Sequence, residues 1–182
     1  MNPVARVVST VALAATGFFT IYAFQTLPAD AQLAVHWNVE GRADGFAGRE
    51  ALLLLPAIFA ASALLIALAI RFDPKRANIV RSAESLGYVG MGLVLLFAVT
   101  QSAIINSGYG EAARLDHAVP IVVGALFVLL GYAAPQIRQN YTVGVRLPWT
   151  LESVAAWDAA HATVGRAWIL TGAVTLLLGA IP

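Results

Sequence analysis

Five stretches of this chain contain no charged residue, and short segments in which the charges gather separate them. The stretches cover residues 7–29, 51–70, 85–110, 117–137 and 167–182. A helix needs about 20 mostly apolar residues to cross the hydrocarbon core of a bilayer. The pattern therefore predicts an all-α fold, a polytopic transmembrane helix bundle that forms one domain over residues 1–182. Its five spans are expected at about 5–27, 50–71, 84–107, 117–136 and 162–181.

The composition supports a membrane protein and narrows its chemistry. Hydrophobic residues make up 59% of the 182 residues and charged residues 12%, a balance unlike that of soluble domains. The net charge of +1 does not suit a nucleic-acid-binding surface, so no direct nucleic-acid partner is expected. With no cysteine, this chain forms no disulfide and no Cys-ligated metal site, and we expect no cofactor. The first apolar stretch is longer than the core of a signal peptide, so we expect it to remain as a helix.

The distribution of Lys and Arg predicts how the chain crosses the membrane, because these residues stay on the cytoplasmic side in short loops. The outer side would hold only Arg42, Arg49 and Arg114, whereas the inner side would hold Arg6, Arg71, Lys75, Arg76, Arg81, Arg138, Arg146 and Arg166. We therefore expect the N-terminus on the cytoplasmic side of the membrane and the C-terminus on the outer side. The outer loop is then 28–49 and the inner loop 137–161.

Small and polar residues inside the third span indicate helix packing. Gly87, Gly90 and Gly92 would let a neighbouring helix approach closely. The Gln101 amide is expected to bond another helix, since an unpaired amide in a membrane is costly.

The outer loop combines strand-like alternation with turn residues. Apolar side chains alternate at Leu33, Val35 and Trp37, and the pairs Glu40-Gly41 and Asp44-Gly45 are typical of turns. We expect a small β element on the membrane surface, with Trp37 and Phe46 at headgroup depth.

The same loop offers polar side chains for binding a peptide or a lipid headgroup. The candidate ligand-binding residues are His36, Trp37, Asn38, Gly41 and Asp44. A metal could use some of these together with Glu40 and with Glu111, Asp116 and His117 of the second outer loop. No metal-ligand spacing is present, so we assign no metal site.

The inner loop leads into the fifth span. Pro148 favours extended geometry at Leu147, and Thr150 is a suitable N-cap for a helix starting at Leu151. From there one helix face carries Trp157, His161, Gly165 and Trp168. This stripe suits packing inside the bundle, with His161 hydrogen-bonded and Gly165 at a close approach.

Two functional interpretations of the inner loop remain open beside packing. Arg146, Trp149 and Trp157 are residue types that dominate protein-binding hot spots. His161, near Asp158 and Glu152, could instead act as a base with an orienting carboxylate. No catalytic motif accompanies this histidine, so we do not expect an enzyme.

The inner motif resembles the SdpI family of bacterial integral membrane proteins, whose pattern is Asn-x-x-x-Gly-x-Arg-x-Pro-Trp-Thr-Leu followed by Trp and by His or Asn. The matching residues are Asn140, Gly144, Arg146, Pro148, Trp149, Thr150, Leu151, Trp157, His161 and Gly165. The outer loop resembles the short domain of unknown function that often precedes this family, through Pro28, His36, Trp37, Asn38, Gly41, Asp44 and Gly45.

The resemblance implies toxin resistance and signal transduction by an immunity protein of the bacterial cytoplasmic (inner) membrane. Such a protein senses a secreted peptide toxin outside and sequesters a small cytoplasmic repressor inside. The repressor-docking candidates are then Asn140, Gly144, Arg146, Pro148, Trp149, Thr150, Trp157 and His161. The toxin-sensing candidate is the segment 28–50. The family's sensor has a sixth span, whereas five are expected here, and a homodimer could cover the remaining apolar flank. The alternative is a membrane-embedded enzyme or metal-dependent factor that uses His36 and His117, or His161.

Overall fold

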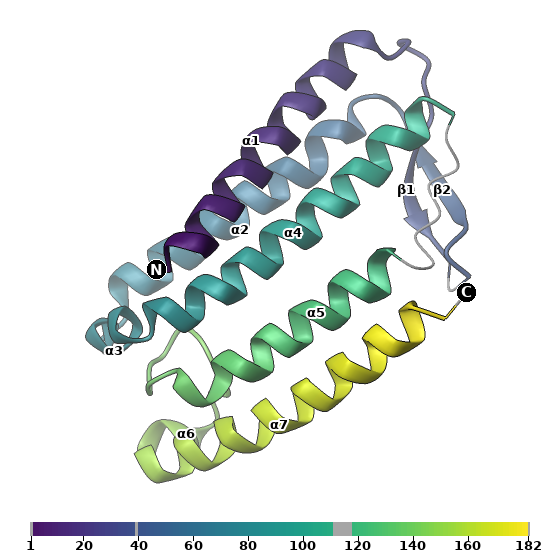
Figure 1. Ribbon diagram of the computed structural model, residues 1–182. Helices are drawn as coiled ribbons and strands as arrows, with labels where there is room; N and C mark the ends of the chain where they lie inside the picture. Colours follow the sequence, from purple (N-terminus) through teal and green to yellow (C-terminus); the bar gives the residue numbers. More distant parts are fainter. Residues whose placement is uncertain (1, 39, 111–117, 182) are drawn as a thin grey trace.

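The computed structural model describes residues 2–38, 40–110 and 118–181, and five long helices run side by side through it (Figure 1). They are α1 (Pro3–Thr26), α2 (Ala51–Phe72), α4 (Ala83–Gly108), α5 (Ala118–Ala133) and α7 (Val154–Gly179). Each helix, α5 together with the turn that follows it, is long and apolar enough to cross a membrane. The predicted all-α transmembrane bundle with a small β element is confirmed.

Shorter elements close the bundle at its two ends (Figure 1). One end holds α3 (Arg76–Arg81), the 3-10 turn η1 (Ala134–Gln136) and α6 (Pro148–Glu152), and we call it the α3 end. The other holds the hairpin of β1 (Leu33–Trp37) and β2 (Ala43–Ala47), and we call it the hairpin end. The N-terminus lies toward the α3 end and the C-terminus lies beside the hairpin. The α3 end is therefore the one whose loops were predicted to be cytoplasmic.

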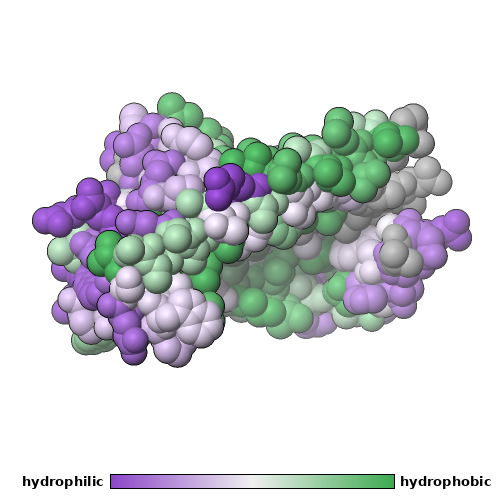
Figure 2. Space-filling model, turned by 90° about the horizontal axis from the view of Figure 1, so that it is seen from below, coloured by the Kyte–Doolittle hydropathy of each residue, from purple (hydrophilic) through white to green (hydrophobic). Residues whose placement is uncertain are grey.

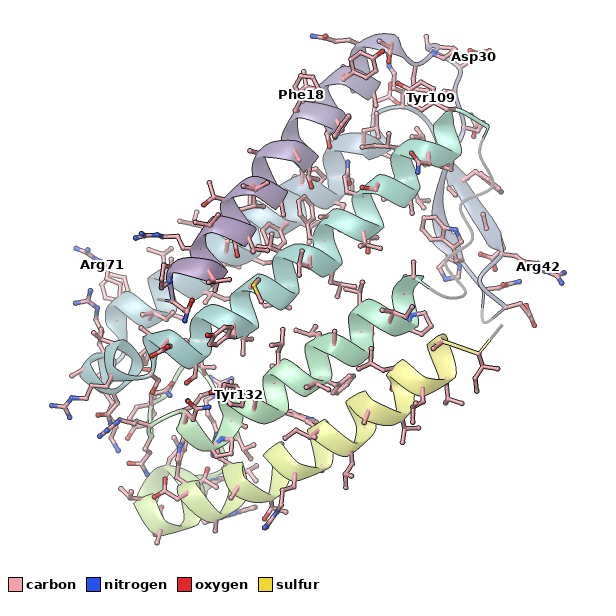
Figure 3. All side chains as sticks on the ribbon, in the orientation of Figure 1. Phe18, Asp30, Arg42, Arg71, Tyr109 and Tyr132 are labelled. Atoms are coloured by element: carbon pink, nitrogen blue, oxygen red, sulfur yellow. The ribbon has the colours of Figure 1, made fainter. Side chains whose placement is uncertain are left out.

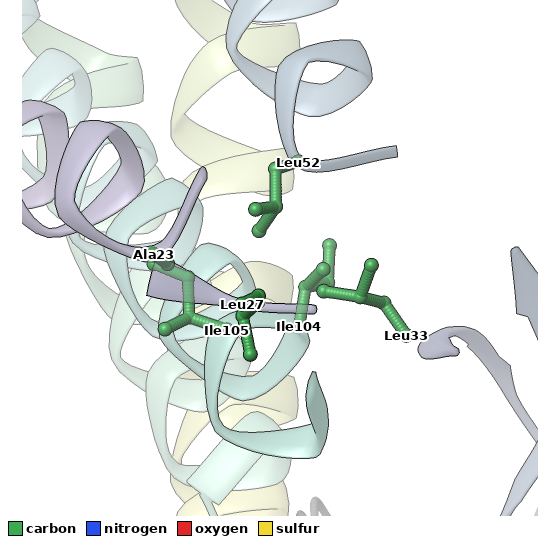
Figure 4. Packing of buried hydrophobic residues seen from close by; sticks show 6 residues of the cluster. All are labelled: Ala23, Leu27, Leu33, Leu52, Ile104 and Ile105. Carbon is green, nitrogen blue, oxygen red and sulfur yellow. The ribbon is translucent and has the colours of Figure 1, made fainter. Parts of the chain in front are cut away.

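The helices pack as two groups joined through α4. Helix α1 packs along α4 and α2 rests mainly on α4, while α5 and α7 form the most extensive helix pair. Contacts between α4 and α5 connect the groups. A buried cluster fixes the first group at the hairpin end, where it joins α1, α2, α4 and β1 (Figure 4): Ala23, Leu27, Leu33, Leu52, Ile104 and Ile105.

The α5–α7 pair is held by glycines that face each other. A Cβ atom added at Gly131 would lie 2.6 Å from the Gly165 carbonyl oxygen, and one added at Gly172 would lie 2.6 Å from that of Gly124. Glycine is needed at these places because no side chain fits between two backbones so close. The expected close approach at Gly165 is confirmed.

Gln101 and Gly92 of α4 pack as expected for the third span. Gln101 is fully buried, and its Nε2 donates to the Thr20 hydroxyl (3.1 Å) and to the Leu52 carbonyl (2.9 Å), so the amide bonds two other helices as predicted. A Cβ at Gly92 would meet Leu126 of α5 at 2.8 Å. The expectation is wrong for Gly90, because a Cβ there would meet nothing within 4 Å.

The surface follows the distribution expected in a bilayer. In Figure 2 apolar residues cover the middle of the molecule and hydrophilic residues gather toward its two ends. In Figure 3 Arg71 lies at the α3 end, and Asp30 and Arg42 lie at the hairpin end. Large apolar side chains such as Phe18, Leu65 and Leu170 remain exposed on α1, α2 and α7. The chain is a multi-pass membrane protein.

Candidate functional site

The segment between η1 and α7 is folded around the side chain of Asn140, which is fully buried. Its Nδ2 donates to the carbonyls of Arg138 (2.8 Å) and Val143 (2.9 Å). Its Oδ1 accepts from the backbone amides of Thr142 (2.8 Å) and Val143 (2.6 Å). One amide therefore satisfies four backbone groups that no regular secondary structure would pair.

Trp157 and His161 lie one turn apart on α7 and hydrogen-bond to the backbone of the same segment. Both side chains are buried, and their rings stack with centroids 4.0 Å apart. The Trp157 indole donates to the Ile137 carbonyl (2.7 Å). Nε2 of His161 accepts from the Val145 amide (3.0 Å), so its Nδ1 carries the proton and donates to the Trp157 carbonyl (2.8 Å). The predicted packing role of this helix face is confirmed for both side chains.

Gly144 is required by this arrangement for two reasons. Its φ is +125°, a conformation that L side chains rarely adopt. A Cβ atom would also collide with Nε2 of His161 and lie 2.9 Å from the Trp157 ring. The glycine thus lets the backbone pass directly over the two rings.

Thr150 does not begin a long helix, and the expected helix start at Leu151 is wrong. Thr150 lies inside the short helix α6, where its hydroxyl donates to the Val145 carbonyl (2.7 Å) and accepts from the Leu147 amide (2.9 Å). Ser153 then turns extended and its hydroxyl caps α7 by accepting from the Ala156 amide (3.2 Å). The reason is that the Thr150 hydroxyl hydrogen-bonds to Val145 and Leu147, which precede it, and so does not cap a following helix.

The segment is also fastened to the connection between α2 and α3. Asp73 is buried and accepts from the Tyr141 amide (2.8 Å), the Thr142 hydroxyl (2.7 Å) and the Lys75 amide (2.7 Å). Burial alone would raise the pKa of Asp73, but these hydrogen bonds to its charged form lower the pKa below its ordinary value. Sequence reasoning missed this contact, because nothing in the spacing relates two loops so far apart in the chain.

A pH dependence follows from Asp73. Because its pKa is lower in the folded chain than in the unfolded one, where it is about 3.9, its hydrogen bonds stabilise the fold at neutral pH and are lost as the pH falls through the folded value. We expect the Asp73→Asn variant to be less stable at pH 7, with a difference that shrinks below about pH 4. Thermal unfolding in detergent at several pH values measures this. Asp30→Asn, at the hairpin end, serves as the control, and equal differences at pH 7 and pH 3 would contradict the expectation.

Further bonds from Gln139 complete the attachment. Its Nε2 donates to the backbone carbonyls of Thr150 (2.7 Å) and Leu151 (3.0 Å), and its Oε1 accepts from the Lys75 ammonium. The backbone carbonyl of Gln139 accepts from the side-chain Nδ2 of Asn78 (2.8 Å). Gln139 was not among the predicted site residues. The loop is thus bonded to α3, to α6 and to α7 at once.

The eight candidates of the inner motif fall into two sets. Four are buried in the interior of the loop: Asn140, Thr150, Trp157 and His161. The other four are exposed: Gly144, Arg146, Pro148 and Trp149. The Trp149 side chain is 60% exposed, and Arg146 donates to the Tyr141 carbonyl (2.7 Å), which holds its guanidinium at the surface. Only the second set, which we call the exposed corner, is available to a partner.

At the hairpin end, the five outer candidates form the hairpin and its turn. Asn38 organises the turn, since its Oδ1 accepts from the amides of Glu40 (3.1 Å) and Arg42 (2.9 Å). Gly41 has a φ of +70° in the same turn. Trp37 packs against the buried cluster, whereas Phe46 is 58% exposed.

The two strands bring His36 and Asp44 together. Nδ1 of His36 lies 2.5 Å from Oδ1 of Asp44, and both side chains are exposed. The expected turn at Asp44-Gly45 is wrong, because both residues lie in β2. Gly45 stands opposite His36, where an added Cβ would come within 2.8 Å of the His36 Cβ. A hydrogen bond from the Ala34 amide to the Ser107 hydroxyl (2.8 Å) attaches β1 to α4.

The part of the chain that the structure describes contains no cluster of side chains suited to the metal site of the alternative interpretation. Within 2–38, 40–110 and 118–181, no three His, Asp or Glu side chains gather as a metal site. The proposed ligands Glu111, Asp116 and His117 lie outside the described residues. For His161, both ring nitrogens are already engaged by backbone groups, which disfavours a role as a general base.

Comparison with known proteins relates the two ends to two known segments. The SdpI/YfhL protein family matches residues 136–182, which hold the folded loop and α7. A domain of unknown function, DUF1648, matches residues 11–60, which hold the hairpin. The immunity protein SdpI of Bacillus subtilis (strain 168) is 24% identical over 86 residues. The last quarter of the chain thus carries the SdpI/YfhL segment, and the chain is similar to an SdpI protein.

The resemblance to SdpI proteins expected from the sequence is thereby confirmed. The aligned region covers 47% of this chain and 41% of the Bacillus SdpI protein, so the match spans less than half of that relative. No solved structure matches the chain. The SdpI/YfhL match contains both the buried set and the exposed corner.

Proposed function

We propose that this chain is a membrane immunity and signalling protein of the SdpI type, which binds a secreted peptide toxin at its hairpin end and docks a small cytoplasmic repressor at its α3 end. The observation that carries the proposal is the match of residues 136–182 to the SdpI/YfhL family, together with the similarity to an immunity protein. The chain lies in the bacterial cytoplasmic membrane with its N-terminus inside.

The division of the inner motif supports a docking role for the exposed corner. Asn140, Thr150, Trp157 and His161 use their polar atoms within the loop. Arg146, Pro148 and Trp149 lie on the surface of this braced loop, and Arg and Trp are the residue types that contribute most to protein interfaces. A rigid loop also lowers the entropy lost on binding.

The hairpin supports peptide binding at the opposite end. His36 and Asp44 present a polar pair beside the exposed Phe46, on strands anchored to α4 through Ser107. A bound peptide would change the inner end only if it preferred one helix arrangement over another. The contact of β1 with α4 supplies a physical link between the hairpin and the bundle.

The proposal is tested in Bacillus subtilis cells that lack their own SdpI and express this chain, grown with supernatant from toxin-producing cells. Two double variants are compared with the native chain: His36→Ala with Asp44→Ala, and Arg146→Ala with Trp149→Ala. Survival reports immunity, and affinity capture of the tagged chain reports docking. Glu152→Ala, exposed on α6 beside the corner, is the matched control for the second variant.

We expect the native chain to protect the cells and the hairpin variant to lose protection by about tenfold or more, as hot-spot residues do. The corner variant is expected to keep protection while losing a small DNA-binding protein from the captured fraction. Survival equal to that of cells without the chain contradicts the immunity role. Equal capture by the native chain and the corner variant contradicts the docking role.

A further inference from the structure

An open apolar groove runs along α4 at the α3 end of the bundle. Its volume is about 460 Å³, within the usual range of ligand pockets. Residues of α1, α2, α3 and α4 form its walls, among them Ser9, Ile70, Ile79, Val80, Gly87 and Gly90. Nearly every lining atom is apolar, so the groove suits a hydrocarbon chain.

Two glycines of α4 line the groove. Gly87 and Gly90 are three residues apart and therefore share one helix face. A Cβ atom at Gly90 would meet nothing within 4 Å, in contrast to Gly92, where leucines of α5 fill the space. The hollow at Gly90 is therefore not used for packing by the described part of the chain.

Two arginines lie about one helical turn from lining residues, on two of the helices that form the groove. Arg76 precedes the lining residue Val80 by four positions on α3, and Arg6 precedes Ser9 by three on α1. Such pairs lie on the same face of a helix. Both arginines are exposed, and among the described residues no carboxylate lies within 4 Å of either guanidinium. The nearby Glu84 accepts a hydrogen bond from Asn2 (3.4 Å).

We propose that this groove binds an anionic phospholipid, with one acyl chain beside Gly87 and Gly90 and with the phosphate held by Arg6 and Arg76. Charge and position both favour this occupant. The apolar part lies along spanning helices, and the arginines lie at the helix ends, where headgroups are found. Arginine also binds phosphate through two parallel N–H donors.

The test uses the purified full chain in detergent and native mass spectrometry. Phosphatidylglycerol and phosphatidylcholine with identical acyl chains are added in equal amounts, and the lipid retained per protein is counted. Gly90→Leu fills the groove, and Gly17→Leu is its matched control, because a Cβ at Gly17 also meets nothing within 4 Å but lies outside the groove. Arg76→Gln removes a charge, and Arg42→Gln removes one at the hairpin end.

We expect the native chain and both controls to retain one phosphatidylglycerol in preference to phosphatidylcholine. Gly90→Leu is expected to weaken retention by about tenfold or more, since several methylene contacts are lost, and Arg76→Gln by about fivefold. Val80→Asp, at a rim position that is 60% exposed, should abolish retention without a change in the folded helix content. Equal retention of the two lipids, or undiminished retention by Gly90→Leu or Val80→Asp, overturns the proposal.

Discussion

Replacement of Gly131 by valine is expected to separate α5 from α7 and to leave little folded protein. A Cβ there would lie 2.6 Å from the backbone oxygen of Gly165, which cannot rotate away as a side chain would. Overpacking of a core costs about 1–3 kcal/mol and more where the backbone must move, so we expect a loss of at least about 3 kcal/mol in the free energy of unfolding. Unfolding in mixed micelles of detergent and sodium dodecyl sulfate, followed by circular dichroism, measures it.

The matched control is Gly17→Val in α1. It makes the same change in helix propensity, but a Cβ at Gly17 has open space around it. A branched residue in a helix costs less than about 1 kcal/mol by propensity alone. If both variants lose the same stability, the close approach of α5 and α7 does not carry the energy that we assign to it.

The second large effect is expected for Asn140→Ala. The substitution leaves two carbonyls and two amides of the loop without their partner. A backbone group left unpaired on burial costs about 1–3 kcal/mol, and partial access of water lowers the sum. We expect a loss of about 2–4 kcal/mol in stability, together with faster hydrogen exchange at the amides of Thr142 and Val143.

Asn106→Ala on the exposed surface of α4 provides the comparison and should change stability by less than about 0.5 kcal/mol. Asn140→Asp keeps an acceptor for the two amides and loses the two donors, so it should fall between the native chain and Asn140→Ala. A native exchange rate at both amides in Asn140→Ala would show that another group holds the loop.

The parts of the fold that the sequence predicts are those governed by a local period. The spans follow from stretches of apolar residues, and the stripe of Trp157, His161 and Gly165 follows from helical spacing, so the burial of all three could be expected. The bonding of Gln101 follows equally from the cost of an unpaired amide in a membrane. Each of these features depends on the residues of one helix or on the lipid that surrounds it.

The features that sequence reasoning missed depend on pairing between distant segments. Asp73 accepts hydrogen bonds from Tyr141 and Thr142, which lie far from it in the sequence. The residues of one loop do not indicate that it contacts the other. Thr150 could equally have capped a helix, and only the position of Val145 decides its role. The packing of glycine against glycine is visible in the sequence as a shared spacing. Gly124 and Gly131 are seven residues apart, and so are Gly165 and Gly172.

The same distinction applies to the candidate site. The family resemblance suggested that all eight members of the inner motif could contact a partner, but burial and hydrogen bonds divide them into two sets. Asn140 and Thr150 bond their own loop, whereas Trp149 is left at the surface. The motif thus combines residues that shape the loop with residues that the loop presents, and burial in the folded chain distinguishes the two.

The glycine faces of α5 and α7 also bear on how the protein is made. Helix α5 precedes α7 in the chain, and the spanning stretch of α7, which includes Arg166, is the least apolar of the five. Spanning helices insert first and associate afterwards. The glycine face of α5 is therefore the surface on which α7 packs once both helices span the membrane. Because lipid supplies no hydrophobic force that brings two helices together, the assembly of this half of the molecule depends on how closely these two glycine faces fit.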